Sequence, residues 1–116
     1  MRGVRRIALP GAILLVGCMP AVAQSDSAQY ETARHIMRAR CTICHTAIAQ
    51  EDGLNAASQP PKGIKFDTAA DVQRWAPLIL EQAVKLKRMP PDNATHMSDD
   101  ERAMLKMWIE AGAKLP

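Results

Sequence analysis

The chain has 116 residues, which gives room for one domain and excludes a two-domain enzyme. Its formal net charge is +3, but Arg2, Arg5 and Arg6 lie together at the start, and the other 12 basic residues balance the 12 acidic ones. The basic excess therefore belongs to the first segment and does not predict a nucleic-acid-binding face. Aromatic residues are too few to close a core easily, so we expect something besides side chains to fill its middle.

The first 23 residues have the pattern of a secretory signal peptide. A basic start at residues 1–6 precedes an apolar stretch at 7–17 and the small residues Ala21-Val22-Ala23 of a signal-peptidase site. The apolar stretch is too short for a helix that crosses a membrane, which needs about 20 residues. We therefore expect cleavage after residue 23, export to the periplasm, and a mature domain over residues 24–116 without a transmembrane helix.

A second interpretation of the leader stays open. The sequence Leu15-Val16-Gly17-Cys18 resembles a bacterial lipoprotein signal, which would end before Cys18 and leave that cysteine as an acylated N-terminus. Acyl chains would tether the same domain to a membrane surface, since each buried CH₂ contributes about 0.8 kcal/mol. The chemistry of the domain is the same in both cases.

Residues 27–40 predict a first helix, because they contain neither Pro nor Gly and carry apolar residues at helical spacing. Ser25 and Asp26 are candidate caps, and the helix is expected to run directly into Cys41. The predicted apolar stripe consists of Tyr30, Ala33 and Met37, with Cys41 continuing it.

A second helix is predicted after a loop over 46–65, whose Gly and Pro residues are typical of a segment that wraps a site. Thr68 and Asp71 have the spacing of a weak capping box, and Pro77 is expected to split or kink the helix. Pro90-Pro91 forbids its continuation. The predicted apolar stripe consists of Val72, Trp75, Ile79, Leu80, Ala83 and Leu86.

The last helix has the clearest signals. Residues 98–101, Ser-Asp-Asp-Glu, form a capping box with further carboxylates at the positive end of the helix dipole, and Gly112 is expected to end the helix. Its predicted apolar stripe consists of Met104, Leu105, Trp108 and Ile109. No segment alternates long enough to predict a strand, so the predicted fold class is small and all-α.

Residues 41–45, Cys-Thr-Ile-Cys-His, match C-x-x-C-H, the pattern that attaches a c-type haem. Two thiols at this spacing can form thioethers with the two vinyl groups on one porphyrin edge, and the adjacent imidazole can then reach the iron. We therefore predict one covalent haem c with its iron, held by Cys41 and Cys44 as attachment residues and His45 as the proximal axial ligand.

Three other roles for these residues stay open. A thioredoxin-like motif needs a βαβ setting, for which the chain shows no pattern. A structural zinc site needs a fourth ligand, for which only His35 and His96 remain. A disulfide between Cys41 and Cys44 closes a loop so small that it adds about 1–2 kcal/mol. Export favours the haem, because c-type haem is attached outside the bacterial cytoplasm.

The second, distal axial ligand is predicted to be Met89. Pro90-Pro91 follows it, removes backbone donors and fixes φ, so the loop presents a thioether sulfur with little entropy left to lose. His96 is the next candidate, and an open site is the third. The other residues with a suitable donor atom are His35, Met97, Met104 and Met107, of which the last two are expected to pack in the core or lie on the surface.

The order of these motifs resembles that of class I c-type cytochromes. C-x-x-C-H follows a first helix, Met-Pro-Pro comes much later, and the last helix carries Trp-Ile-x-Ala-Gly-Ala, so that the resemblance covers nearly all of residues 24–116. More narrowly, residues 40–45, 61–64, 89–95 and 100–113 are similar to the cytochrome c domain appended to membrane-bound bacterial urate oxidases. The similarity covers only that domain, so it does not imply urate oxidation.

The broad resemblance implies a cytochrome c-like fold with three to five helices wrapped around one covalent haem, His45 proximal and Met89 distal. His/Met ligation raises the potential relative to two imidazoles, because the soft thioether favours ferrous iron. The implied function is a one-electron carrier in a periplasmic electron-transfer chain, and not an enzyme. Two alternatives stay open: a haem protein that binds or senses a small ligand when Met89 dissociates, and a small cytochrome subunit of a larger oxidoreductase complex.

The expected partners are redox proteins, and no nucleic acid is expected. The nearly balanced charge of residues 24–116 gives no strong steering sign. Five basic residues have two interpretations, a docking patch beside an exposed haem edge or solvated helix ends. They are Lys62, Lys65, Lys85, Lys87 and Arg88.

Overall fold

The computed structural model describes residue 17, residues 24–48 and residues 59–116. These residues form three α-helices, two short 3₁₀-helices and one π-helix, and no strand lies among them, which confirms the predicted all-α class for this part of the chain. The elements are α1 (Asp26–Arg40), η1 (Pro61–Gly63), α2 (Ala69–Ile79), the π-helix η2 (Leu80–Lys85), η3 (Pro91–Asn93) and α3 (Asp99–Glu110). The predicted leader, apart from Gly17, and the alternative lipid site at Cys18 lie outside the described residues.

Helix α1 begins and ends as the sequence predicts. Ser25 is the N-cap, and its side-chain oxygen accepts a hydrogen bond from the N–H of Ala28 at 3.3 Å. Cys41 follows the last turn at once and is half-buried against the core, so the predicted continuation of the stripe is confirmed. The buried face of α1 consists of Tyr30, Ala33, Ile36 and Met37.

Helix α2 continues through Pro77 and changes its hydrogen bonding only afterwards. It starts with the predicted capping box, in which Thr68 and Asp71 exchange side-chain bonds with each other's N–H, both at 3.1 Å. Pro77 has no N–H to donate, and from Leu80 the chain follows the wider π pattern. The expected break is therefore found three residues later than Pro77, as a change of helix type without a gap.

Helix α3 also starts with its predicted capping box. The N–H of Glu101 donates to Oγ of Ser98 at 3.1 Å, and the N–H of Ser98 donates to Oε2 of Glu101 at 2.8 Å. Gly112 follows the helix with a φ of +104°, a conformation that costs a residue with a Cβ atom and that glycine adopts freely. The predicted end of the helix is confirmed.

Two members of the predicted stripes are exposed. Met104 is 47% exposed and Leu86 is 43% exposed, so the prediction that they contribute to the apolar face is wrong for both. In α3 the buried face instead runs through Arg102, Leu105 and Trp108 at a spacing of three, which leaves Met104 at its edge. Leu86 lies just beyond the end of η2, where the chain has left the helix surface that packs.

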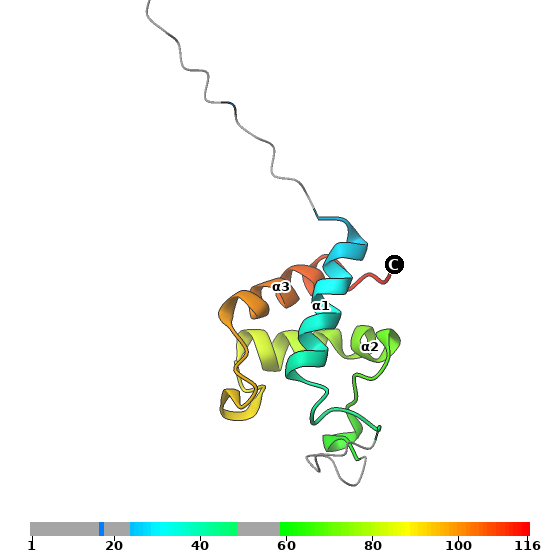
Figure 1. The fold of residues 1–116 in the computed structure, drawn as a ribbon, viewed down its shortest axis with the longest axis vertical. Helices are drawn as coiled ribbons and strands as arrows, with labels where there is room; N and C mark the ends of the chain where they lie inside the picture. Colours follow the sequence, from blue (N-terminus) through cyan, green and yellow to red (C-terminus); the bar gives the residue numbers. More distant parts are fainter. Residues whose placement is uncertain (1–16, 18–23, 49–58) are drawn as a thin grey trace, which may run out of the picture.

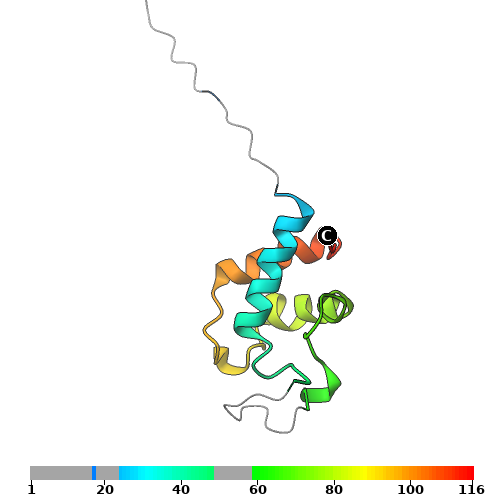
Figure 2. The same cartoon turned by 45° about the vertical axis from the view of Figure 1, so that its right-hand side comes forward.

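Helix α1 packs against α3, and α3 packs against η2. Figures 1 and 2 show α1 running across both, with the segment after α1 and the loop before α3 at the same lower end of the molecule. Trp108 of α3 joins the layers, since its ring contacts Tyr30 of α1 at 6.3 Å between centroids. The core comprises Tyr30, Ala33, Ile36, Met37, Phe66, Val72, Ala76, Ile79, Ala83, Met97, Leu105, Trp108 and Ala113. None of the helices described is long and apolar enough to cross a membrane.

Candidate functional site

The C-x-x-C-H segment forms a tight turn on the end of α1. The N–H of Cys41 donates to the carbonyl of Met37 at 2.9 Å, and the N–H groups of Cys44 and His45 both donate to the carbonyl of Cys41, at 3.2 and 3.0 Å. Cys41 and Cys44 are free thiols, the first half-buried and the second exposed. Burial raises the pKa of Cys41 to about 12, with Arg102 acting in the opposite direction and Cys44 and Glu101 raising it further. The structure thus gathers the three predicted residues in one turn.

The ring of His45 is held in one orientation and one tautomer. Its Nδ1 lies 2.8 Å from the carbonyl oxygen of Ile64, and because a carbonyl only accepts, Nδ1 carries the proton and donates. In the neutral ring the second nitrogen, Nε2, then has its lone pair free. Phe66 contacts the ring at 5.0 Å between centroids, and its N–H donates to the carbonyl of His45 at 2.9 Å. The residues around Ile64 therefore act as a support for this imidazole.

Asp67 ties the turn after His45 to the start of α2. Its carboxylate accepts hydrogen bonds from the Oγ1 of Thr46 and from the N–H of Ala47, the second at 2.9 Å. The Oγ1 of Thr46 in turn accepts from the N–H of Ile48 at 3.0 Å. The two bonds to Asp67 join residues 21 and 20 positions apart, and so connect the turn after His45 to the residues just before α2.

Met89 lies at the start of the loop that leads to α3, and its backbone is held at both polar groups. Its N–H donates to the carbonyl of Gln82 in η2 at 3.1 Å, and its carbonyl accepts from Nη1 of Arg102 in α3 at 2.9 Å. Pro90 is buried, whereas the Met89 residue is 37% exposed. The predicted stiff presentation of this side chain therefore has two anchors besides the prolines.

Arg40, the residue before Cys41, links the motif to the loop of Met89. Its Nη1 donates to the carbonyl of Thr95 at 2.6 Å, and the Oγ1 of Thr95 donates back to the carbonyl of Arg40 at 2.9 Å. Its Nε lies 3.1 Å from both carboxylate oxygens of Glu101. Burial raises the pKa of Glu101, but hydrogen bonds from Ser98 and Arg40 outweigh it and hold that pKa below its ordinary value. The two segments predicted to supply axial ligands are thus bonded to each other through Arg40, Thr95 and α3.

Arg102 and Asn93 are site residues that sequence reasoning missed. Arg102 is only 6% exposed, and its guanidinium also donates to the carbonyl of Ala83 and to Oδ1 of Asn93. The sequence contains one indication of the role of Arg102, which is its spacing. It stands three residues before Leu105 and six before Trp108, and so shares the buried face of α3 with them. A charge placed on an apolar stripe indicates a residue with a specific partner.

The other candidate distal ligands occupy different places. Met97 is buried in the core at 3% exposure, and Met104 and Met107 are exposed on α3. His35 and His96 are both exposed. The loop that is bonded to the motif segment through Arg40 and Thr95 carries three of these candidates, Met89, His96 and Met97.

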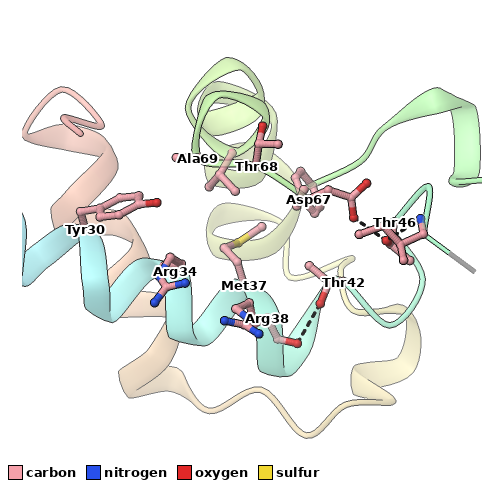
Figure 3. A pocket seen from close by; sticks show the side chains of 12 residues that line it. Tyr30, Arg34, Met37, Arg38, Thr42, Thr46, Asp67, Thr68 and Ala69 are labelled. Atoms are coloured by element: carbon pink, nitrogen blue, oxygen red, sulfur yellow. Dashed lines mark hydrogen bonds between the residues drawn. The ribbon is translucent and has the colours of Figure 1, made fainter. Parts of the chain in front are cut away.

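A cavity of about 490 Å³ lies beside the motif, between α1 and residues 66–72. Figure 3 shows its wall of α1 side chains facing the start of α2. Thr42 lines it, but Cys41, Cys44, His45 and Met89 do not. This cavity therefore lies on the Thr42 side of the motif. Its lining residues are Tyr30, Arg34, Met37, Arg38, Thr42, Thr46, Ile48, Phe66, Asp67, Thr68, Ala69 and Val72.

Two of the five basic residues that have two interpretations, a docking patch or solvated helix ends, are paired with carboxylates. Lys87 pairs with Asp99 at 2.7 Å, and Lys85 pairs with Glu81 at 3.9 Å. Across the part of the chain that the structure describes, no three His, Cys, Asp or Glu side chains gather in a way that could hold a metal ion, so the zinc alternative has no assembled ligand set there.

No family model, curated protein or solved structure matches this chain. The resemblance to class I c-type cytochromes accordingly stays a prediction that rests on the motifs and their order.

Proposed function

We propose that residues 24–116 form a monohaem c-type cytochrome that carries one electron at a time between partner proteins outside the cytoplasm. The observation that carries this proposal is the C-x-x-C-H turn on the end of α1, in which His45 has its Nδ1 fixed by the carbonyl of Ile64. We propose Cys41 and Cys44 as the thioether residues, and His45 and Met89 as the iron ligands.

The donor set of this segment fits a covalently attached haem. Cys41 and Cys44 are free thiols in one turn, so each can add across a vinyl group, with the sulfur bonding to one carbon and the proton going to the other. In the neutral imidazole of His45 the proton is at Nδ1, which leaves the lone pair of Nε2 for the iron. A neutral imidazole whose other nitrogen donates to a carbonyl is the usual form of a metal-bound histidine.

The surroundings of the thiols disfavour the redox alternative. Reactive dithiols of the thioredoxin type have a cysteine with a lowered pKa. Burial of Cys41 acts in the other direction and raises its pKa to about 12. The described elements also lack the βαβ setting of that class.

Electron transfer needs only that the chain hold the iron ligands still. The bound haem would supply a one-electron couple, whose potential a thioether ligand raises. In this chain the carbonyl of Ile64 orients the imidazole of His45, while Gln82 and Arg102 hold the backbone of Met89. Fixed ligands reduce the structural change that accompanies each electron transfer. Electron transfer makes or breaks no covalent bond, and it therefore requires no acid, base or nucleophile.

Intact mass and visible spectra of the protein test this proposal, with the full chain expressed in a host that matures c-type haem. We expect a mass increased by one haem, a long-wavelength sulfur-to-iron band in the ferric form, and a ferrous spectrum unchanged by carbon monoxide. The same measurement identifies the N-terminus, and so separates cleavage before Gln24 from acylation at Cys18. A colourless protein of unmodified mass would refute the proposal.

A double variant provides the control for attachment. Replacing Cys41 and Cys44 by serine removes both thioethers and leaves His45 and Met89 in place, so the haem should be lost on denaturation in acidified solvent.

A spectrum that changes with carbon monoxide in the wild-type protein would favour a ligand-binding haem protein over a carrier.

A further inference from the structure

Arg102 is a buried cation with neutral partners. It is 6% exposed, and no carboxylate pairs with it among the residues described. Its Nη1 donates to the carbonyls of Ala83 and Met89, the second at 2.9 Å, and its Nη2 donates to Oδ1 of Asn93 at 3.3 Å. Burying a charge is unfavourable unless it is hydrogen-bonded, so these acceptors are what makes this position tolerable for an arginine.

The three acceptors of Arg102 belong to three successive pieces of the chain. Ala83 lies in η2, Met89 begins the loop, and Asn93 ends η3. A planar guanidinium with several donors in a fixed fork can bond all three at once, which a lysine ammonium on a flexible stem does poorly. Arg102 therefore fixes the course of the chain on both sides of Met89.

Asn93 extends this anchoring to the end of the loop. Its Oδ1 accepts from the N–H of Met97 at 2.9 Å as well as from Arg102, and its Nδ2 donates to the carbonyl of Met97 at 3.1 Å. Met97 is buried in the core. The loop from Met89 to Met97 is thus tied to α3 at one side chain and to the core at its far end.

We propose that Arg102 is a positioning residue that holds the backbone of Met89 so that its thioether stays on the iron. The inference rests on the proposed function, because it requires Met89 to be the distal ligand. A ligand on a fixed segment returns to the iron faster than a competing ligand binds, since little entropy is lost at each return. The Met89 residue is 37% exposed, so burial does not fix its position. The hydrogen bond from Arg102 to its backbone carbonyl restricts it instead.

The test uses the haem-loaded protein and its sulfur-to-iron band. Alkaline pH supplies competing ligands, and the midpoint of the band's disappearance measures how firmly Met89 is held. We expect Arg102→Gln to lower this midpoint by about one pH unit, which is a tenfold larger population without Met89 at a fixed pH. Asn93→Ala removes one acceptor of Arg102 and both side-chain hydrogen bonds to the backbone of Met97. It should therefore shift the midpoint of the band in the same direction by a smaller amount.

Two further variants separate positioning from charge and from general stability. Arg102→Lys keeps the positive charge without the fork, so we expect it to behave like Arg102→Gln. Leu105→Val weakens the same buried face of α3 without a bond to the loop, so it should lower the denaturant midpoint of unfolding and leave the midpoint of the band in place.

The outcomes are separable from those of the proposed function. A band midpoint unchanged in Arg102→Gln, full recovery in Arg102→Lys, or an equal shift in Leu105→Val would each overturn the role of Arg102 and leave the cytochrome intact. A wild-type protein with haem but no band overturns Met89 as ligand, and this inference with it. Absence of haem from the wild type overturns the proposed function itself. If Arg102→Gln does not fold, Arg102→Lys and Asn93→Ala decide the question.

Discussion

Glu101 connects the start of α3 to the residue that precedes Cys41, so its replacement should loosen both. Its carboxylate accepts from the N–H of Ser98 at 2.8 Å and from Nε of Arg40 at 3.1 Å. The Glu101 and Arg40 side chains are 20% and 30% exposed, so solvent screens this pair less than a surface pair. Glu101→Gln keeps the shape of the side chain but removes the charge.

The size of the effect follows from the bonds that are weakened. A hydrogen bond to a charged group contributes about 1.5–3 kcal/mol, and a neutral bond contributes about 1 kcal/mol. The amide oxygen of a glutamine can still accept one bond, and Arg40 keeps its bond to the carbonyl of Thr95. We therefore expect Glu101→Gln to lower the free energy of unfolding by about 1–2 kcal/mol.

The pH dependence checks the assignment of this loss to the carboxylate. The pKa of Glu101 is lowered from its ordinary value of 4.5 in the folded chain, so the carboxylate stabilises the fold fully above that value. This contribution is lost as the pH falls through the folded pKa. The difference between wild type and Glu101→Gln in urea unfolding should thus be full well above the ordinary pKa of 4.5 and should shrink as the pH is lowered further into the acid range.

A surface pair provides the matched control. Glu31 pairs with Arg34 at 3.1 Å, but their side chains are 58% and 47% exposed, so Glu31→Gln should cost no more than about 1 kcal/mol. Equal losses in Glu101→Gln and Glu31→Gln, or a Glu101→Gln difference that persists unchanged in acid, would refute the reasoning.

Three further predictions test the ligand, the core and the end of α3. Met89→Ala should keep the covalent haem and lose the sulfur-to-iron band, whereas the control Met104→Ala, at a methionine that is also exposed, should keep both, as mass and spectrum will show. A band that survives in Met89→Ala excludes Met89 as the ligand. Trp108→Phe loses the Nε1 bond to Lys114 at 2.9 Å and part of the packing, so it should lower the free energy of unfolding by about 1–3 kcal/mol in denaturant titration; an unchanged midpoint contradicts this packing. Gly112→Ala should lower the free energy of unfolding by about 1–2 kcal/mol, because alanine is strained at φ +104°, while its added Cβ would meet no atom closer than 3.8 Å. Thermal unfolding measures this loss, and no loss would mean that the helix end shifts.

Helix starts were predictable because their determinants are local. Ser25, the Thr68–Asp71 pair and the Ser98–Glu101 pair cap the helices that the sequence places after them, and each bond spans three residues. The phase of a stripe was less predictable. Hydrophobicity alone places Met104 on the packed face of α3, whereas packing against α1 and η2 selects the row that contains Arg102.

The supports of the candidate site could not be predicted, because they join residues that only the fold brings together. The bond from His45 to Ile64 spans 19 positions, and the bond from Arg40 to Glu101 spans 61. No residue pattern announces that a particular carbonyl will accept from Nδ1. The motif itself is a string of five neighbours, so its location was available from the sequence, while its orientation was not.

Neighbouring residues of α3 hold the two halves of the candidate site. Glu101 bonds Arg40, which precedes the motif, and Arg102 bonds the carbonyl of Met89. Successive residues of a helix point about 100° apart, so one turn of α3 can address both segments without either side chain crossing the other. The capping bonds of Ser98 fix where that turn begins, and thereby set both contacts at once. The start of α3 is therefore the element on which the relative placement of His45 and Met89 depends most directly.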